Sequence, residues 1–194
     1  MNKRDIIAYF DRRASDWDRH MVTDDGKITA ILNAAGVCAN ASVLDVACGT
    51  GVLFPYYLRR NVSRITGVDI SAEMVRIAAG KCRDPRVEVL CGDIESLPVH
   101  RQYDCCVVYN AFPHFPDPER LIRSLTAWLP AGGRLTVAHS MGLEALRRHH
   151  AGRADHVSRE MLPPDSLAAL LAPLFQVETA LATEDLYIVS GIRR

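Results

Sequence analysis

Short runs of β-branched and other apolar residues alternate along this chain with longer stretches whose apolar positions recur at helical spacing. The runs predict strands, because parallel strands covered on both faces are apolar almost throughout, and the periodic stretches predict amphipathic helices. Six of the predicted strands lie at 43–46, 64–70, 87–90, 103–110, 175–181 and 185–190. One more, the fifth in chain order, ends at about residue 139. This alternation over 194 residues predicts one α/β domain.

A glycine turn follows the first predicted strand. Residues 43–46 are largely apolar, and Gly49 and Gly51 come directly after them. Glycine lets a chain turn tightly and bring its backbone close to a ligand. Asp69 closes the second predicted strand, at the edge where open parallel sheets bind ligands, and its carboxylate can accept both hydroxyl groups of a ribose. The combination predicts a nucleoside-binding site.

The residue after the turn separates two kinds of nucleoside cofactor. A dinucleotide fold uses Gly-x-Gly-x-x-Gly, so that a pyrophosphate can lie on the following helix, but here Phe54 stands where the third glycine is expected. This departure disfavours a NAD-dependent oxidoreductase, which is kept as an alternative.

Acidic and small residues occupy alternate positions at the turn, at Asp45, Ala47, Gly49 and Gly51. This pattern resembles the first motif of the class I S-adenosylmethionine-dependent methyltransferases, with Ala47 in place of a common glycine. The segments Val-Leu-Asp-Val-Ala-Cys-Gly-Thr-Gly and Asn-Ala-Phe-Pro-His-Phe-Pro-Asp resemble the ubiquinone/menaquinone-biosynthesis type and other small-molecule methyltransferases. The resemblance implies a Rossmann-like, seven-stranded, mostly parallel sheet with helices on both faces and an antiparallel last strand.

The same resemblance implies S-adenosyl-L-methionine as the cofactor, held at four strand ends. The methionine pocket would be shaped by Asp45, Ala47, Cys48, Gly49 and Gly51. Asp69 would bind the ribose, and Asp93 would accept a hydrogen bond from the adenine amino group. The adenine ring would pack against Ile70 and Ile94, and Asn110 would lie above the sulfonium. The physics agrees, since a carboxylate is an acceptor suited to an exocyclic amine and adenine needs apolar faces.

Within the single domain 1–194, four parts are expected: an N-terminal helical lid (1–40), a cofactor-binding core (41–139), a substrate-cap insertion (140–164), and a C-terminal helix with a strand pair (165–194). Tyr9 and Trp17 recur at helical spacing in the lid and are candidate substrate contacts, although a helix that simply packs its aromatic stripe is equally compatible.

The predicted insertion carries Arg147 and His149, which suit an anionic group of a substrate. A solvated helix face or a homodimer contact is the alternative use of this segment. A metal site with its histidines is disfavoured, because the Glu of a His-Glu-x-x-His motif is absent.

Two histidines are candidate catalytic residues because both follow strand ends on the ligand side. A histidine can remove a proton from a hydroxyl, thiol or amine as the methyl group is transferred. His139 ends the fifth predicted strand. His114 lies in a segment that resembles one found in many such enzymes with different substrates, which favours a structural or cofactor-proximal role for it. The predicted reaction is in-line methyl transfer to an O, N, S or C nucleophile of a small molecule.

The composition limits the classes of partner and the compartment that we expect for this protein. Lys plus Arg and Asp plus Glu each number 23, so the formal net charge is zero, which disfavours a nucleic acid substrate. No apolar run reaches the roughly 18 residues of a membrane helix, and we expect a cytoplasmic protein. The 6 cysteines include no Cys-x-x-Cys pair, which favours reduced thiols. A cysteine triad of a metalloid methyltransferase and a noncatalytic S-adenosylmethionine-binding module remain alternatives.

Overall fold

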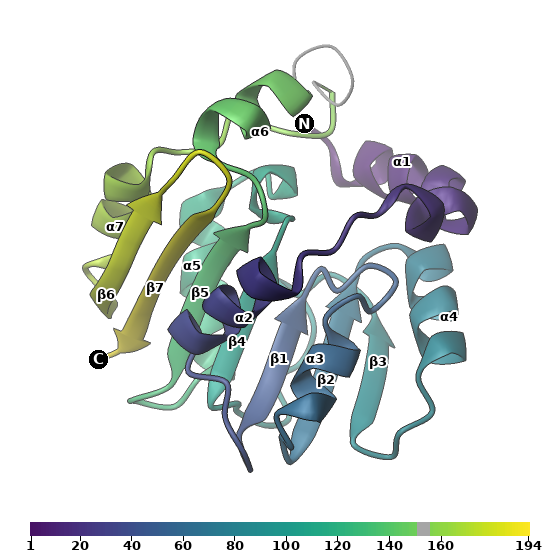
Figure 1. Ribbon diagram of the computed structural model, residues 1–194, viewed down its shortest axis with the longest axis horizontal. Coiled ribbons are helices and arrows are strands. Elements are labelled where there is room, and N and C mark those ends of the chain that lie inside the picture. The colour runs from purple at the N-terminus through teal and green to yellow at the C-terminus, as the bar shows by residue number, and fades with distance from the viewer. Residues whose placement is uncertain (151–155) are drawn as a thin grey trace.

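A central sheet of seven strands organises the molecule (Figure 1). The computed structural model describes residues 1–150 and 156–194, apart from the side chains of His20, His149 and His150. The strands are β1 (Ser42–Val46), β2 (Arg64–Asp69), β3 (Val87–Cys91), β4 (Cys105–Tyr109), β5 (Arg134–His139), β6 (Phe175–Ala182) and β7 (Tyr187–Arg193). Their order is β3-β2-β1-β4-β5-β7-β6, and β7 alone runs antiparallel to its neighbours. The predicted fold class is confirmed.

Helices cover both faces of this sheet and the end at which its parallel strands finish. They are α1 (Lys3–Trp17), α2 (Asp25–Ala34), α3 (Phe54–Arg59), α4 (Ala72–Lys81), α5 (Pro118–Leu125), α6 (Leu143–His150) and α7 (Pro164–Leu171), with short 3-10 turns at Asp18–His20, Phe112–His114 and Thr126–Trp128. In Figure 1, α2, α3 and α4 lie on one face, and α5 and α7 lie on the other. Helices α1 and α6 lie across the carboxyl ends of the parallel strands. The two accessory segments, which are the N-terminal segment with α1 and the segment after β5 with α6, therefore cover the end of the sheet at which such folds bind ligands.

Local capping explains where two helices begin. The Ser71 hydroxyl accepts a hydrogen bond of 3.2 Å from the Met74 amide at the start of α4. The Asp117 carboxylate does the same for the Arg120 amide, at 2.9 Å, before α5. Ser and Asp suit both positions, because their side-chain oxygens satisfy the unpaired amides of a first helical turn.

The fourth strand is shorter than predicted, since residues 103 and 104 leave the ladder. The buried Tyr103 hydroxyl donates to the Thr66 hydroxyl at 2.8 Å, and the Asp104 carboxylate accepts from the Ser42 amide at 2.7 Å. These side-chain bonds join the residues just before β4 to β1, its neighbour, and to β2, one strand further away.

The sheet centre forms the core. Strands β1, β4 and β5 are buried almost throughout, whereas β3 at the edge is only half-buried. All six cysteines are free thiols; Cys48, Cys105 and Cys106 are buried, whereas Cys38 and Cys91 are exposed. Burial raises the pKa of Cys105 to about 12. The three buried thiols are therefore inert packing groups.

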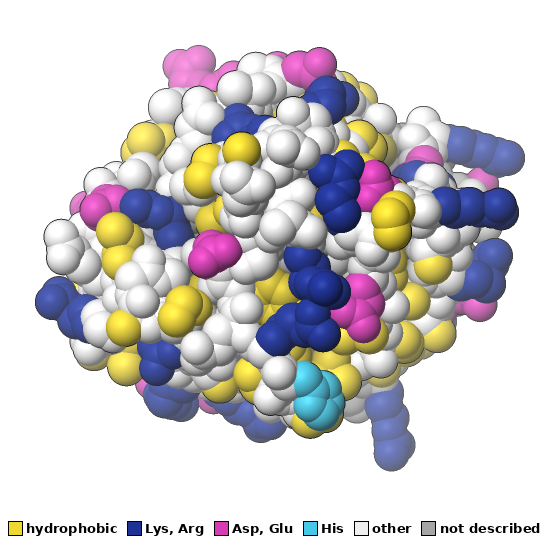
Figure 2. Space-filling model, turned by 90° about the horizontal axis from the view of Figure 1, so that it is seen from below, with side chains coloured by type: hydrophobic (Ala, Val, Ile, Leu, Met, Phe, Trp, Pro, Cys, Tyr) yellow, Lys and Arg dark blue, Asp and Glu magenta, His cyan; other side chains and the backbone are white. Residues whose placement is uncertain are grey.

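The amino ends of the strands form the face shown in Figure 2, where basic, acidic and apolar side chains are interspersed. This face has no single-sign field of the kind that binds a polyanion. In the part of the chain that the structure describes, every helix is too short or too polar to cross a bilayer.

Candidate functional site

A cavity of about 660 Å³ lies over the carboxyl ends of β1 to β5, beneath α1. Its size is in the range of small-molecule sites. The predicted site residues that line it are Asp45, Ala47, Cys48, Gly49, Asp69, Ile70, Asp93, Ile94, Asn110, His114, His139 and Trp17. The topology therefore brings together side chains that are far apart in the sequence.

The two glycines of the turn after β1 do different things. Gly49 has a φ of +54°, and a Cβ built on it would meet nothing within 4 Å, so its missing side chain leaves room inside the cavity. Gly51 has a φ of +79° and is not among the lining residues; a Cβ there would lie 2.6 Å from the Phe54 ring. This glycine makes room for Phe54, and the contact of Gly51 with a ligand stays a prediction.

Ala47 begins the same turn with a φ of +55°, in the left-handed region. Non-glycine residues adopt this conformation at a cost of about 1–2 kcal/mol. The position therefore has the backbone conformation for which glycine is better suited, and this explains the glycine that the motif commonly has.

The Asp69 carboxylate is fixed by two backbone amides. Oδ2 accepts from the Gly49 amide at 2.8 Å, and Oδ1 accepts from the Ser71 amide at 2.9 Å. Burial raises the pKa of Asp69, and the two backbone hydrogen bonds partly oppose the shift. Each oxygen keeps a second lone pair for a ligand hydroxyl. The carboxylate thus also joins the β1 turn to the start of α4.

Asp45 is the most deeply buried carboxylate of the site. It is 2% exposed and lines the cavity, and none of the described residues hydrogen-bonds to its Oδ2. Burial, and then the nearby Asp69 carboxylate, raise its pKa well above the ordinary value. A buried acceptor without a donor is unfavourable, so this oxygen suits a cationic ligand group with N–H donors.

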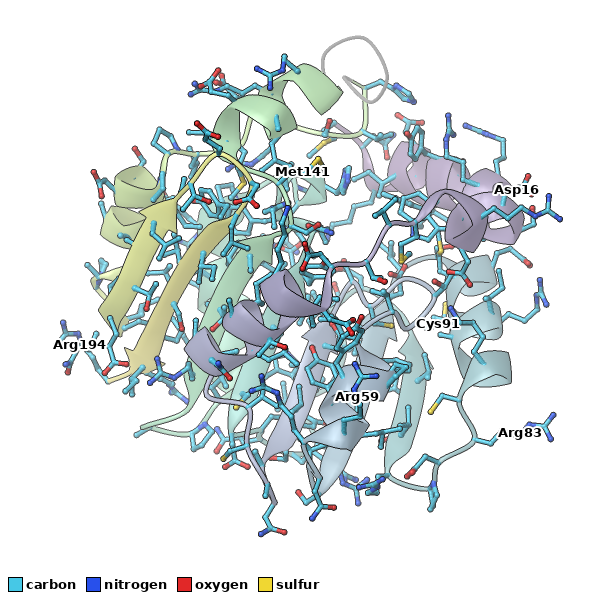
Figure 3. The ribbon with its side chains drawn as sticks, viewed as in Figure 1. Asp16, Arg59, Arg83, Cys91, Met141 and Arg194 are labelled. Atoms are coloured by element: carbon cyan, nitrogen blue, oxygen red, sulfur yellow. The ribbon has the colours of Figure 1, made fainter. Side chains whose placement is uncertain are left out.

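Asp93 follows β3 and faces the cavity between Ile70 and Ile94, which supply apolar surface. Its Oδ1 accepts from the Glu95 amide at 3.1 Å, and its Oδ2 accepts from the Ser96 hydroxyl and the Lys3 ammonium. In Figure 3, Cys91 marks the end of β3 below α1, the helix that carries Lys3.

The other half of the cavity lies at the ends of β4 and β5. Asn110 has a φ of +53°, and its side chain accepts from the Ser140 amide at 2.9 Å and donates to the Ser140 hydroxyl at 3.1 Å. His139 is 1% exposed and packs edge-on against Tyr187, with 6.0 Å between ring centroids. Met141, labelled in Figure 3, lies between this strand end and α6. Asn110, His139, Ser140 and Met141 all line this part of the cavity.

His114 links the two accessory segments. Its Nδ1 lies 2.9 Å from the Val157 carbonyl oxygen, and its ring packs edge-on against Phe10 of α1 at 4.9 Å. Because a carbonyl oxygen only accepts, Nδ1 carries the proton, and in the neutral ring Nε2 is the basic nitrogen. The geometry supports a structural role for His114 and identifies Nε2 as its basic nitrogen.

The cover of the cavity is built by both accessory segments together. Ile6 of α1 and Val157 after α6 form one buried cluster. Trp17 lines the cavity, but Tyr9 does not; the Tyr9 ring instead lies under the Arg13 guanidinium at 3.7 Å. We call α1 with residues 156–161 the roof.

Arg147 is not among the residues that line the cavity, and its predicted contact with a substrate stays a prediction. Its guanidinium forms ion pairs with Glu144 at 2.6 Å and Glu160 at 2.9 Å, and it therefore fastens α6 to the segment that follows. The side chain of His149 lies outside the described residues. Among those that are described, no group of three His, Cys, Asp or Glu side chains could hold a metal.

Sequence reasoning missed Lys27, Met21 and Tyr109, which all line the cavity. The Lys27 ammonium lies 3.2 Å from Asp185 and 3.4 Å from the Ser140 carbonyl oxygen. A lysine in the first turn of a helix is equally common on a solvated surface, so no sequence signal distinguished it.

Comparison with known proteins supports the same class. Residues 43–133 match the sequence model of a family described as "Methyltransferase domain". The chain is 28% identical over 139 residues to the malonyl-[acyl-carrier protein] O-methyltransferase of Priestia megaterium, covering 70% of this chain and 51% of the relative. It is 33% identical over 96 residues to a ubiquinone biosynthesis O-methyltransferase of Coxiella burnetii, covering 48% and 41%. The chain spans about half the length of the curated relatives it matches.

A solved structure matches almost the whole chain. The N-methyltransferase NodS of Bradyrhizobium japonicum, in complex with S-adenosyl-L-homocysteine, superimposes with a TM-score of 0.77 at 15% identity, covering 97% of this chain and 98% of that one. The fold is that of the class I S-adenosylmethionine-dependent methyltransferases. The predicted resemblance to this class is confirmed, in fold by NodS and in sequence by the family match.

Proposed function

We propose that the chain is an S-adenosylmethionine-dependent methyltransferase that transfers a methyl group to a small-molecule nucleophile. The observation that carries this proposal is the continuity of the cavity. Asp69 and Asp93 line its nucleoside half, and His139 and Met141 line its other half. A noncatalytic nucleoside-binding module needs only the first half. The match of residues 43–133 to a methyltransferase family supports the same function.

The lining residues fit the cofactor group by group. The unpartnered Asp45 Oδ2 suits the methionine ammonium, and the Lys27 ammonium suits the methionine carboxylate. The open space at Gly49 admits the chain between them, and Asp69 and Asp93 suit the ribose hydroxyls and the adenine amino group. A nucleotide phosphate would instead meet the carboxylates of Asp45 and Asp69, which disfavours NAD.

The cofactor supplies a methyl group already activated on a sulfonium. The residues of this chain then have to bind the acceptor, orient its nucleophile in line with the methyl group and exclude water. Holding two reactants in this way can contribute about 7–11 kcal/mol. The roof supplies the exclusion of water, and Asn110, fixed by Ser140, defines the wall between the two halves.

A general base is required only where the acceptor has to lose a proton. We propose His139 for this role, because its buried ring lies at the end of β5 in the acceptor half of the cavity. His114 is the second choice, since its contacts with Val157 and Phe10 already explain its position.

We also propose a small molecule as the acceptor and the cytoplasm as the location. A cavity of about 660 Å³ and the mixed charge of the opposite face support the first. Six free thiols support the second, because reducing compartments keep cysteines unpaired. A homodimer contact through residues 140–164 stays a prediction.

The experiment that tests the function is calorimetric titration with S-adenosylmethionine, S-adenosylhomocysteine and NAD in parallel. We expect binding of the first two without NAD. The protein is then incubated with S-adenosylmethionine and small phenols, thiols, amines and carboxylic acids, and S-adenosylhomocysteine is measured. Binding of NAD alone would overturn the proposal, and binding without turnover across the acceptor panel would favour the noncatalytic module.

A further inference from the structure

A compact charge cluster lies where the roof crosses the loop after β3. The Lys3 ammonium of α1 is hydrogen-bonded to both Asp93 Oδ2 and Glu95 Oε2. The Glu95 side chain is 2% exposed, and the Arg120 guanidinium of α5 lies 3.6 Å from its second oxygen. Lys3 is therefore anchored on a buried carboxylate at the adenine end of the cavity, which it also lines.

The hydrogen bonds of Asp93 leave a defined position for one more donor. Oδ2 accepts from the Lys3 ammonium and the Ser96 hydroxyl, which uses both of its lone pairs. Oδ1 accepts only from the Glu95 amide, at 3.1 Å. Its second lone pair remains for a ligand donor, and Ile70 and Ile94 line the cavity beside it.

We propose that Lys3 is a positioning residue that holds Asp93 so that Oδ1 receives the adenine amino group, which makes recognition of the base depend on the roof. This inference rests on the proposed function, because it takes Asp93 as the adenine acceptor. Lys3 and the base use different oxygens of one carboxylate, so the roof and the cofactor bind Asp93 together rather than in competition.

The electrostatics of Asp93 agree with this arrangement. Burial raises its pKa, but the hydrogen bonds from Lys3 and from the Glu95 amide outweigh burial, and the pKa lies below the ordinary value. The carboxylate thus stays ionised, and acts as an acceptor only, at any pH near neutral. Without Lys3, its pKa rises.

Two further contacts hold α1 in place independently of Lys3. The Asp11 carboxylate accepts from the Ser71 hydroxyl at 2.5 Å, and the Asp18 carboxylate accepts from the Thr50 hydroxyl at 2.6 Å and pairs with the Lys81 ammonium at 2.7 Å. A substitution of Lys3 therefore leaves the roof fastened to the loops after β2 and β1.

The test compares two ligands that differ at the edge of the base that carries the amino group: deamination replaces the 6-amino group by a carbonyl oxygen and puts a proton on N1. S-adenosylhomocysteine and its deaminated form, S-inosylhomocysteine, are titrated calorimetrically into the wild type, Lys3→Met, Lys3→Arg and Lys81→Met between pH 5 and pH 8, a range that brackets neutrality. Lys81→Met is the matched control, since it removes a lysine ion pair with Asp18, the residue that follows α1, and leaves Lys3 and Asp93 unchanged.

We expect the wild type to prefer S-adenosylhomocysteine on the order of tenfold or more, as a donor to a charged acceptor should. Lys3→Met should lose most of this preference and should lose affinity at a higher pH than the wild type. Lys3→Arg should keep the preference, and Lys81→Met should behave as the wild type.

Three results for Lys3→Met would count against the inference alone. The first is an unchanged preference for S-adenosylhomocysteine. The second is an equal loss of affinity for both ligands, which indicates only a looser roof, and the third is tighter binding of S-adenosylhomocysteine, which indicates that Lys3 competes with the base. Failure of the wild type to bind S-adenosylhomocysteine would instead overturn the proposed function, and this inference with it.

Discussion

Gly51 and Phe54 are packed so closely that a Cβ on Gly51 would lie 2.6 Å from the Phe54 ring. The ring also lies within 2.6 Å of the corresponding position on Gly67 of β2, so two glycines make the space for one aromatic side chain. Phe54 is 1% exposed and begins α3. The glycine turn thus serves the packing of α3 against β2 as well as the ligand.

This arrangement predicts opposite phenotypes for two similar substitutions. Gly51→Ala should destabilise the fold by about 2–4 kcal/mol, because a left-handed φ and a clash with Phe54 add. Gly49→Ala should cost about 1–2 kcal/mol for its φ alone, yet it should weaken binding of S-adenosylhomocysteine more, since its methyl group enters the cavity. Denaturant unfolding and calorimetry measure both quantities; equal unfolding free energies of the two variants would contradict the packing argument.

Ala47→Gly should stabilise the protein. Ala47 has a φ of +55°, and glycine removes the strain of that conformation, with a net gain of up to about 1 kcal/mol after its own entropy is counted. Ala35→Gly is the control, because Ala35 has a φ of −75° and should lose stability. Thermal unfolding should move the two midpoints in opposite directions by about 2–4 °C.

Asp45→Asn should make the ligand-free protein more stable at neutral and alkaline pH. Burial and Asp69 raise the folded pKa of Asp45 above its unfolded value of about 3.9. The folded protein then holds a proton that the unfolded chain releases, so the wild type loses stability as the pH rises above about 4 until the folded pKa is passed. The gain at pH 7 should be about 1–3 kcal/mol.

Thermal unfolding of this variant from pH 4.5 to pH 8 should show a flatter profile than the wild type; parallel profiles would mean that Asp45 does not titrate in this range. Binding of S-adenosylhomocysteine should weaken in the same variant, because an amide lacks the charge that suits the methionine ammonium.

Asp69→Asn should weaken binding of S-adenosylhomocysteine by on the order of tenfold or more. An Asn side chain has one oxygen, so it cannot accept from the amides of both Gly49 and Ser71 while it binds the ribose. Asp11→Asn is the control, since Asp11 bonds to Ser71 but does not line the cavity. Calorimetry that finds unchanged affinity in Asp69→Asn would remove Asp69 from the site.

His139→Ala should leave the affinity for S-adenosylhomocysteine within about twofold of the wild type and lower kcat by about 10²–10⁴ if the acceptor has to lose a proton. His114→Ala, in contrast, should also weaken the cofactor affinity, because His114 holds Phe10 and Val157 of the roof. Turnover of His139→Ala equal to that of the wild type at saturating acceptor would exclude His139 as the base.

The sequence predicted the parts of the molecule that depend on local chemistry or on strand ends. Caps such as Ser71 and Asp117 are recognisable in a sequence because a cap contacts residues two or three positions away. Asp69 and Asp93 were placed in one site because parallel strands end at one edge.

The remaining features depend on tertiary contacts between distant residues. Arg147 was expected to face a substrate, but Glu160 neutralises it, and nothing in its own helix indicates that partner. Lys27 was missed because its place over the cavity is set by the packing of α2 against β7. The role of Gly51 could not be separated from that of Gly49 without the position of the Phe54 ring.

The contact of Ile6 with Val157 makes the cover of the cavity one cooperative unit drawn from two distant parts of the chain. Opening one part exposes the apolar surface of the other, so the two should open together. Amide hydrogen exchange should therefore slow in α1 and in residues 156–161 to the same extent when a ligand binds. Entry and exit of ligands would then be governed by the free energy of one local unfolding event, which is separable from the affinity of the pocket itself.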